Sequence, residues 1–103
     1  MSLPVVLTPV AQAEYDQAFD FYEGRRTGLG IQFANRVKDA LDRIGANPKI
    51  HAIVYDPLRR AVVKQFPYCI YYRELADRVE VISVFHTSRD PADWQTLADE
   101  LDP

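Results

Sequence analysis

The sequence predicts an α+β protein in which two helices precede a mainly antiparallel sheet. Up to about Pro48, apolar residues recur at helical spacing, and after it they recur at every second position. The expected order is an N-terminal strand, an antiparallel helical hairpin, three to four strands and a short C-terminal helix, which segregates the helices from the sheet. Because the 103 residues contain no repeat, low-complexity tract or linker, we expect one domain, residues 1–103.

The first half of the chain predicts a strand and two helices. The stretch LPVVLTP is expected to be a short strand, after which Thr8 caps a helix and Pro9 opens it. The first helix has its apolar face at Ala11, Tyr15, Ala18, Phe19 and Tyr22. The second helix follows two glycines, ends at GANP, and has its apolar face at Phe33, Ala34, Val37, Leu41 and Ile44. The short break between the helices predicts an antiparallel hairpin.

The second half predicts four extended segments: IHAIVYD, RRAVVKQF, PYCIYYREL and RVEVISVFH. We expect the last segment to place Val79, Val81 and Phe85 on one side and Ile82 and Val84 on the other. Apolar residues on both sides of this strand favour a central strand that is covered on both faces.

A strand-to-helix junction is predicted in the stretch SRDPADW. Asp90, Pro91 and Asp93 form a helix-start pattern of cap, first position and acidic third position. We expect Trp94 to pack back on the sheet. The residues after Leu97 are acidic and nearly free of apolar side chains, so we expect them to be dispensable for folding.

Composition limits the class of protein. The chain is 48% hydrophobic, which suffices for a core, and its single cysteine allows no internal disulfide. No long apolar run or signal peptide is visible, so we expect a cytoplasmic protein without membrane contact. The formal net charge of −3 argues against a strong nucleic-acid binder. However, residues 90–103 contain acidic residues and no Lys or Arg, so an acidic tail masks a mildly basic body.

Three stretches, YDQAFDFYE, RRAVVKQFPYCIYYR and VFHTSRDPADW, together resemble the RelE/ParE superfamily, the toxins of bacterial type II toxin–antitoxin (plasmid stabilisation) systems. The resemblance runs from about Val5 to Trp94. It implies a small toxin that stops growth and is held inactive by a cognate antitoxin encoded by an adjacent gene. It also implies a choice of activity, because RelE-like members cut mRNA in the ribosome and ParE-like members poison DNA gyrase.

Nuclease activity would require particular catalytic residues. Metal-free RNA cleavage needs a base, an acid and cations near the phosphate. The candidates for these roles are Arg60, Lys64, Arg73, His86 and Arg89. No Tyr, His, Lys or Arg follows Trp94, so the C-terminal acid or base of the family's nucleases has no counterpart here, and the acidic tail would repel RNA.

We therefore interpret the chain as a ParE-like toxin that inhibits growth by binding a macromolecular target such as DNA gyrase, without bond-breaking chemistry of its own. Two alternatives stay open: a RelE-like, ribosome-dependent mRNA endonuclease, and a degenerate, non-toxic module that still binds an antitoxin. The helical hairpin and the exposed sheet edges are expected to bind an antitoxin tail as a helix plus an added strand. A homodimer is an option when the antitoxin is absent.

Three of the candidate cations also have a structural explanation. Arg60 and Lys64 could form ion pairs with Glu74 and Glu80 across the sheet. Arg89 could pack on Trp94 or pair with Asp93. These pairs compete directly with a functional role for the three cations.

His86 is best explained as a neutral histidine at a strand end, hydrogen-bonded to the backbone. It has no second His or Cys at ligand spacing, so we expect no metal site and no cofactor. Cys69 lies between apolar neighbours, which favours a buried, inert thiol over a nucleophile.

Overall fold

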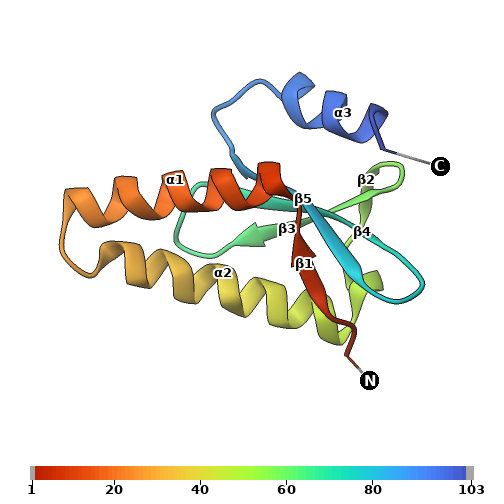
Figure 1. Cartoon of the computed structure of the whole chain (residues 1–103), viewed down its shortest axis with the longest axis horizontal. Helices are drawn as coiled ribbons and strands as arrows, with labels where there is room; N and C mark the ends of the chain where they lie inside the picture. Colours follow the sequence, from red (N-terminus) through yellow and green to blue (C-terminus); the bar gives the residue numbers. More distant parts are fainter. Residues whose placement is uncertain (1, 102–103) are drawn as a thin grey trace.

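The computed structural model describes residues 2–101 and has the predicted α+β architecture (Figure 1). The observed order is one strand, two helices, a short 3₁₀ helix, four strands and a last helix. The bounds are β1 (Val5–Leu7), α1 (Pro9–Arg25), α2 (Leu29–Ala46), η1 (Pro48–Ile50), β2 (Ile53–Tyr55), β3 (Leu58–Val63), β4 (Tyr68–Glu74), β5 (Val79–His86) and α3 (Ala92–Asp99).

The five strands form one sheet in the order β1-β5-β4-β3-β2. The four strands after the hairpin are paired antiparallel, as expected, while β1 joins the other side of β5 in parallel. β5 therefore lies inside the sheet, and β1 and β2 form its two edges. Among residues 2–101 no helix is both long and apolar enough to cross a bilayer.

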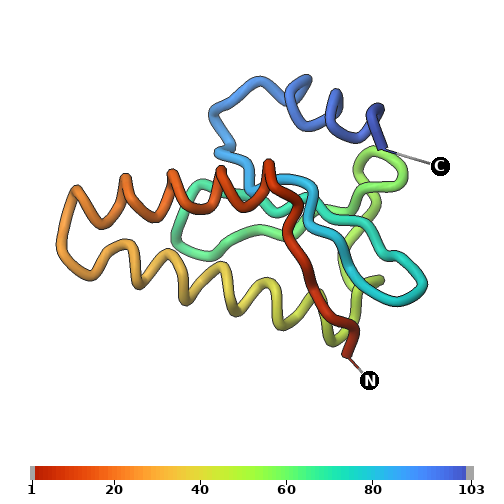
Figure 2. The backbone as a smooth tube through the Cα atoms, viewed as in Figure 1, coloured from red at the N-terminus to blue at the C-terminus, as the bar shows by residue number. Residues whose placement is uncertain are grey.

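Helices α1 and α2 lie side by side (Figure 2), and the face of the sheet under them is built around an aromatic cluster. Phe33 of α2 has no exposed surface, and four aromatic rings surround it with centroids 5.2 to 5.8 Å away. The four rings belong to Tyr15, Tyr22, Phe66 and Tyr68. Because the cluster draws side chains from both helices and from β4, it fixes the hairpin on the sheet.

The connection between the two helices is held by Glu23 of α1. Its carboxylate accepts hydrogen bonds from the backbone N–H groups of Gly28 at 2.9 Å and Gly30 at 3.0 Å. These N–H groups lie at the start of α2, which has no capping side chain of its own. Gly28 has a positive φ of 91°, and a Cβ on Gly30 would lie 2.9 Å from the Glu23 carboxylate, so both glycines are required here.

The opposite face of the sheet is covered by α3. The Trp94 ring stacks on Tyr71 of β4 with centroids 4.2 Å apart, which confirms that this tryptophan packs back on the sheet. Ala98 is buried and Leu101 is half-buried in the same cluster, and Asp99 accepts a 2.7 Å hydrogen bond from Tyr55. The residues after Leu97 were expected to be dispensable for folding on the basis of their composition, and these contacts count against that expectation. Residues 102 and 103 lie outside the described part.

The side-chain alternation predicted for β5 is wrong in its second half. Tyr71 of β4 is opposite Ser83 and Tyr72 is opposite Val81, so Ile82 is an extra residue in β5. This bulge shifts the later residues by one position. Val79, Val81 and Val84 consequently pack under the hairpin, whereas Ile82 and Phe85 pack under α3. The broader prediction, that β5 is covered on both faces, is confirmed.

Candidate functional site

The five candidate residues do not converge on one site. Arg60 and Arg73 lie on β3 and β4, and Lys64 follows the end of β3. His86 ends β5, and Arg89 lies in the connection from β5 to α3. The geometry of each group shows which contacts its charge already makes.

Arg73 is engaged by a carboxylate. Its guanidinium forms a 2.9 Å ion pair with Glu80, which is its direct cross-strand partner on β5, and both side chains are less than one-fifth exposed. Glu74 pairs instead with Lys49 at 2.9 Å. The expected ion pairs of Arg60 and Lys64 with these two glutamates are absent. In the sheet register, Glu80 is the direct cross-strand partner of Arg73.

Arg60 lies opposite Tyr71, on the face that α3 covers. Burial raises the pKa of the Tyr71 phenol, and a hydrogen bond from Arg60 partly offsets this rise in pKa. Beside it, burial raises the pKa of the Cys69 thiol, which keeps it protonated and agrees with the expected inert cysteine. Arg60 is thus an exposed cation whose hydrogen bond goes to Tyr71, at the part of the face that α3 leaves open.

A polar cluster around Glu14 connects α1 with β5 and with the segment between β5 and α3. This carboxylate, only 14% exposed, accepts hydrogen bonds from Arg89 Nη1 at 2.6 Å, Ser83 Oγ at 2.8 Å and the Val84 backbone N–H at 3.1 Å. The partners lie on β5 and in the connection to α3. Glu14 was missed in the sequence, although its place between Ala11 and Ala18 on the apolar face of the first helix marks it as a buried acid.

Arg89 has further contacts that hold it in place. Its Nη2 lies 3.4 Å from Asp93, so the expected pair with Asp93 is present. Its guanidinium lies over the Phe85 ring, 4.5 Å from the centroid. The predicted packing on Trp94 is wrong, because Trp94 stacks on Tyr71 instead. With two carboxylates around it, Arg89 is a structural cation.

His86 has the expected hydrogen bond to the backbone. Its Nδ1 accepts the Ser88 backbone N–H at 3.0 Å and contacts the Ser88 hydroxyl at 2.7 Å. Because a backbone N–H can only donate, Nδ1 is the acceptor in this hydrogen bond, and Nε2 is the ring nitrogen that is left to donate. The Tyr68 ring meets the imidazole edge-on, with centroids 5.0 Å apart.

A small cavity of about 250 Å³ lies between α1 and the end of β5, and we call it the α1–β5 pocket. Apolar side chains of Ala18, Phe21 and Val84 form part of its wall. Tyr68, His86 and Arg89 supply polar atoms. In the part of the chain that is described, no group of three or more His, Cys, Asp or Glu residues could hold a metal ion.

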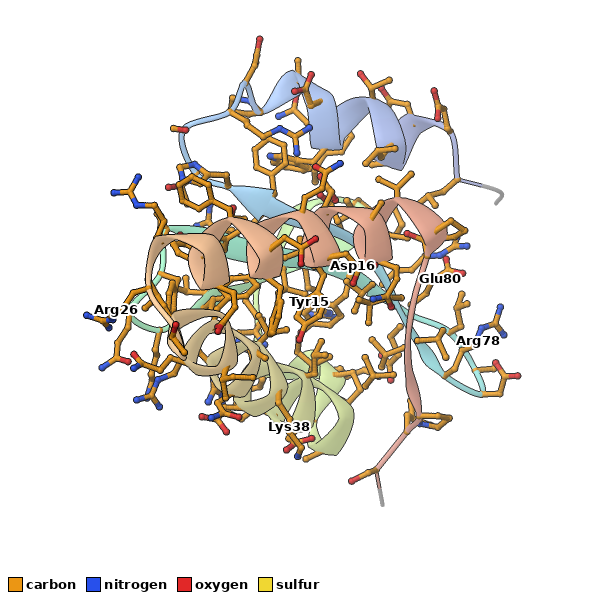
Figure 3. The ribbon with its side chains drawn as sticks, turned by 60° about the vertical axis from the view of Figure 1, so that its left-hand side comes forward. Tyr15, Asp16, Arg26, Lys38, Arg78 and Glu80 are labelled. Atoms are coloured by element: carbon orange, nitrogen blue, oxygen red, sulfur yellow. The ribbon has the colours of Figure 1, made fainter. Side chains whose placement is uncertain are left out.

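A larger groove of about 610 Å³ lies where β1 meets α1 and α2, and we call it the β1 groove. Its apolar lining includes Leu3, Val5, Leu7, Val37 and Leu41. Polar residues at the groove include Gln12, Lys38 and Asp42. Figure 3 shows Tyr15, which also lines the groove, on the side of α1 that faces α2.

The backbone of β1 offers a free edge beside this groove. Pro4 O accepts from Val79 N and Thr8 N donates to Val81 O, so the alternate residues of β1 are paired with β5. Because backbone groups alternate in direction along a strand, the N–H and C=O groups of Val5 and Leu7 point to the outer edge. An apolar groove next to an open strand edge suits a peptide that binds as a helix and an added strand.

Comparison with known proteins gives three results. A family model described as the ParE toxin of the type II toxin–antitoxin system parDE matches residues 5–91. No curated protein matches the chain by sequence. A chain of the chromosomal ParDE TA system from P. aeruginosa superposes with a TM-score of 0.71, over 84% of this chain and 98% of that chain, at 12% sequence identity. At this identity the structural likeness concerns the fold.

Proposed function

The chain belongs to the family of ParE toxins of type II toxin–antitoxin systems, and from this membership we propose that it stops growth by binding DNA gyrase in the cytoplasm, without breaking bonds itself. One observation carries the second half of the proposal. The groups that a nuclease would need are dispersed, and Arg60, Arg73 and Arg89 are engaged by Tyr71, Glu80 and Glu14 respectively. No acid–base pair is positioned around a free phosphate site among residues 2–101.

The acidic residues of α3 also support binding over cleavage. A sheet-face nuclease would have to present Arg60 and Arg73 to RNA. Here α3 packs on part of that face through Trp94 and Ala98 and leaves Arg60 exposed, and the nearby residues Asp99 and Glu100 are acidic and exposed. RNA that approached this face would meet repulsion from these carboxylates.

The cognate antitoxin is proposed to bind in the β1 groove. An amphipathic helix of the antitoxin would bury apolar side chains against Val37 and Leu41, and its following strand would pair with the free backbone groups of Val5 and Leu7. A homodimer through the same edge is the alternative arrangement when the antitoxin is absent.

The antitoxin site is tested with a matched pair of variants on α2. Ala34 lines the groove, whereas Ile31 on the same helix is 54% exposed and does not line it. We expect Ala34→Arg to abolish the rise in melting temperature that excess antitoxin causes, and Ile31→Arg to leave that rise unchanged. An equal response of both variants to the antitoxin would place the antitoxin elsewhere.

The activity is tested by expressing the chain without its antitoxin. We expect growth arrest, a DNA-damage response, and inhibition of purified gyrase in a supercoiling assay. Codon-specific cuts in mRNA that Lys64→Ala abolishes and Lys49→Ala does not would instead identify a ribosome-dependent nuclease. Normal growth at full expression would identify a non-toxic, antitoxin-binding module.

A further inference from the structure

We propose that the end of α1 and the adjoining α1–β5 pocket form a second protein-binding surface, which receives an apolar side chain flanked by carboxylates from the toxin's target. This inference rests on the proposed function, because it assigns the surface that the target would contact. The surface consists of Phe21, Arg25, Arg26 and the pocket residues Tyr68 and His86.

Phe21 is strongly exposed for an aromatic residue. It is 56% exposed, although it lines a pocket that has apolar walls. The Arg25 guanidinium lies over its ring, 5.5 Å from the centroid, and the Tyr22 ring meets it edge-on at 5.3 Å. An exposed aromatic ring that neighbouring side chains already hold in place can bind a partner with little loss of side-chain entropy.

Positive charge that is not neutralised by a carboxylate lies beside Phe21. Within residues 2–101, neither Arg25 nor Arg26 forms an ion pair, and Figure 3 shows Arg26 projecting from the tip of the hairpin. Arg89, by contrast, is already balanced by Glu14 and Asp93. The unpaired positive charge therefore lies at the Phe21 end of the pocket, where it would meet carboxylates of a partner.

His86 and Tyr68 offer hydrogen-bond donors in the lining of the pocket. His86 Nδ1 is occupied by Ser88, which leaves its Nε2–H without an acceptor in the described part of the chain. The Tyr68 hydroxyl likewise has no hydrogen-bond partner there, and burial raises its pKa, so it keeps its proton. Two donors in the lining of the pocket suit a carboxylate or carbonyl that accompanies the apolar anchor.

The dimensions and the surrounding charges favour a protein segment as the occupant. The pocket of about 250 Å³ is smaller than the range of about 300–1,000 Å³ that is typical of small-molecule sites. A nucleic acid would need a longer series of cations, and Asp16 and Asp20 lie along the same helix in a chain of net charge −3. An exposed aromatic residue beside arginines is instead a common centre of protein–protein interfaces.

The surface is separate from the β1 groove. Gln12 and Tyr15 of α1 line the groove, whereas Gln17, Ala18 and Phe21 of the same helix line the pocket. Because no residue lines both cavities, variants can disable one site and leave the other intact.

The experiment uses the full chain and a double variant, Phe21→Ala with Arg25→Glu. The matched control is Ile31→Ala with Arg43→Glu, two exposed residues of α2 outside both cavities. We expect the first variant to lose growth arrest while its melting temperature still rises with antitoxin, and the control to behave as wild type in both assays. Undiminished growth arrest by the Phe21/Arg25 variant would overturn the inference and leave the proposed function intact.

A second measurement decides the inference even if the wild-type chain does not arrest growth, which would refute the proposed function alone. The probe is a synthetic peptide with one leucine between two pairs of aspartates, titrated while backbone amide shifts are recorded by NMR. We expect shifts confined to residues 17–26, 68 and 86, and at least tenfold weaker binding by the Phe21/Arg25 variant. Absence of these shifts, or stronger shifts with a short DNA duplex that depend on Arg25 and not on Phe21, would overturn it.

Discussion

The two faces of the sheet are covered in very different ways. On one face, α1 and α2 enclose a core of fully buried residues centred on Phe33. On the other, the eight-residue helix α3 is anchored by Trp94 and by two polar contacts, Arg89 to Glu14 and Tyr55 to Asp99. The hairpin face therefore carries the global stability of the fold, whereas the α3 face is a smaller unit that can open by itself.

The largest effect is expected from Phe33→Ala on the hairpin face. The substitution removes a ring that has no exposed surface and touches four aromatic side chains, so it should cost about 4–5 kcal/mol of unfolding free energy. Denaturant unfolding with amide hydrogen exchange would measure the loss, and protection should fall throughout α1, α2 and the sheet. A loss of protection confined to one helix would show that the hairpin face does not carry the global stability of the fold.

A smaller and more local effect is expected from Trp94→Ala on the α3 face. The buried indole contributes about 3–4 kcal/mol to packing, but the helix can detach before the rest unfolds. We expect exchange protection to disappear in residues 92–99 while the amides of β1 and the two long helices keep theirs. Equal loss of protection at α2 would show that both faces unfold as one unit.

Two adjacent tyrosines of β4, one on each face, make the stability of the two faces depend differently on pH. Tyr72 points to the hairpin face, where burial raises its pKa to about 12, while Arg60 partly offsets the raised pKa of Tyr71 on the other face. The folded state holds the Tyr72 proton more tightly than the unfolded chain does. Its contribution is therefore complete below about pH 10 and declines as the pH rises to about 12, by roughly 2–3 kcal/mol.

Chemical denaturation between pH 9 and 12 would measure this decline. Other tyrosines with raised pKa values act in the same direction, so Tyr72→Phe should remove only part of the slope. Tyr71→Phe should flatten it less. A larger change from Tyr71→Phe would mean that the α3 face, and not the hairpin face, excludes water more completely.

The smallest effect is expected where α3 begins. Asp90 Oδ1 accepts the Ala92 N–H at 2.9 Å, and Pro91 already has helical dihedral angles, so Asp90 acts as the cap. Asp90→Ala should cost about 1 kcal/mol, seen first as faster exchange in α3, and Asp90→Asn should retain most of the stability. If Asp90→Ala has no effect on α3, then Trp94 and the polar contacts alone determine how this face is held.

Local signals in the sequence predicted the elements and their caps well. Thr8 and Asp90 accept backbone N–H groups at the starts of their helices. Both were recognisable as caps because each precedes a proline and an apolar repeat, a pattern that depends only on neighbouring residues. The bulge at Ile82 could not be read in the same way, because alternation assumes a constant period of two. The parallel pairing of β1 depends on a partner strand more than seventy residues away.

The candidate site was the least predictable part for the same reason. The candidates were chosen by residue type, but the sheet register gives Glu80 to Arg73, and the fold brings Glu14 to Arg89 across 75 positions of sequence. An acidic residue on a helix is usually a solvated side chain, so its long-range partner must be known before its role is visible. The β1 groove and the exposed Phe21 depend on tertiary packing in the same way.

The pairing of β1 with β5 also sets an order of events during protein synthesis. β1 is made first, yet its partner, residues 79–81, is made only when most of the chain has left the ribosome's catalytic centre. Until then the first strand has no sheet to join, and one wall of the β1 groove does not exist. An antitoxin that fills this groove can therefore bind only after β5 has been made, so its supply has to be timed against the translation of that strand.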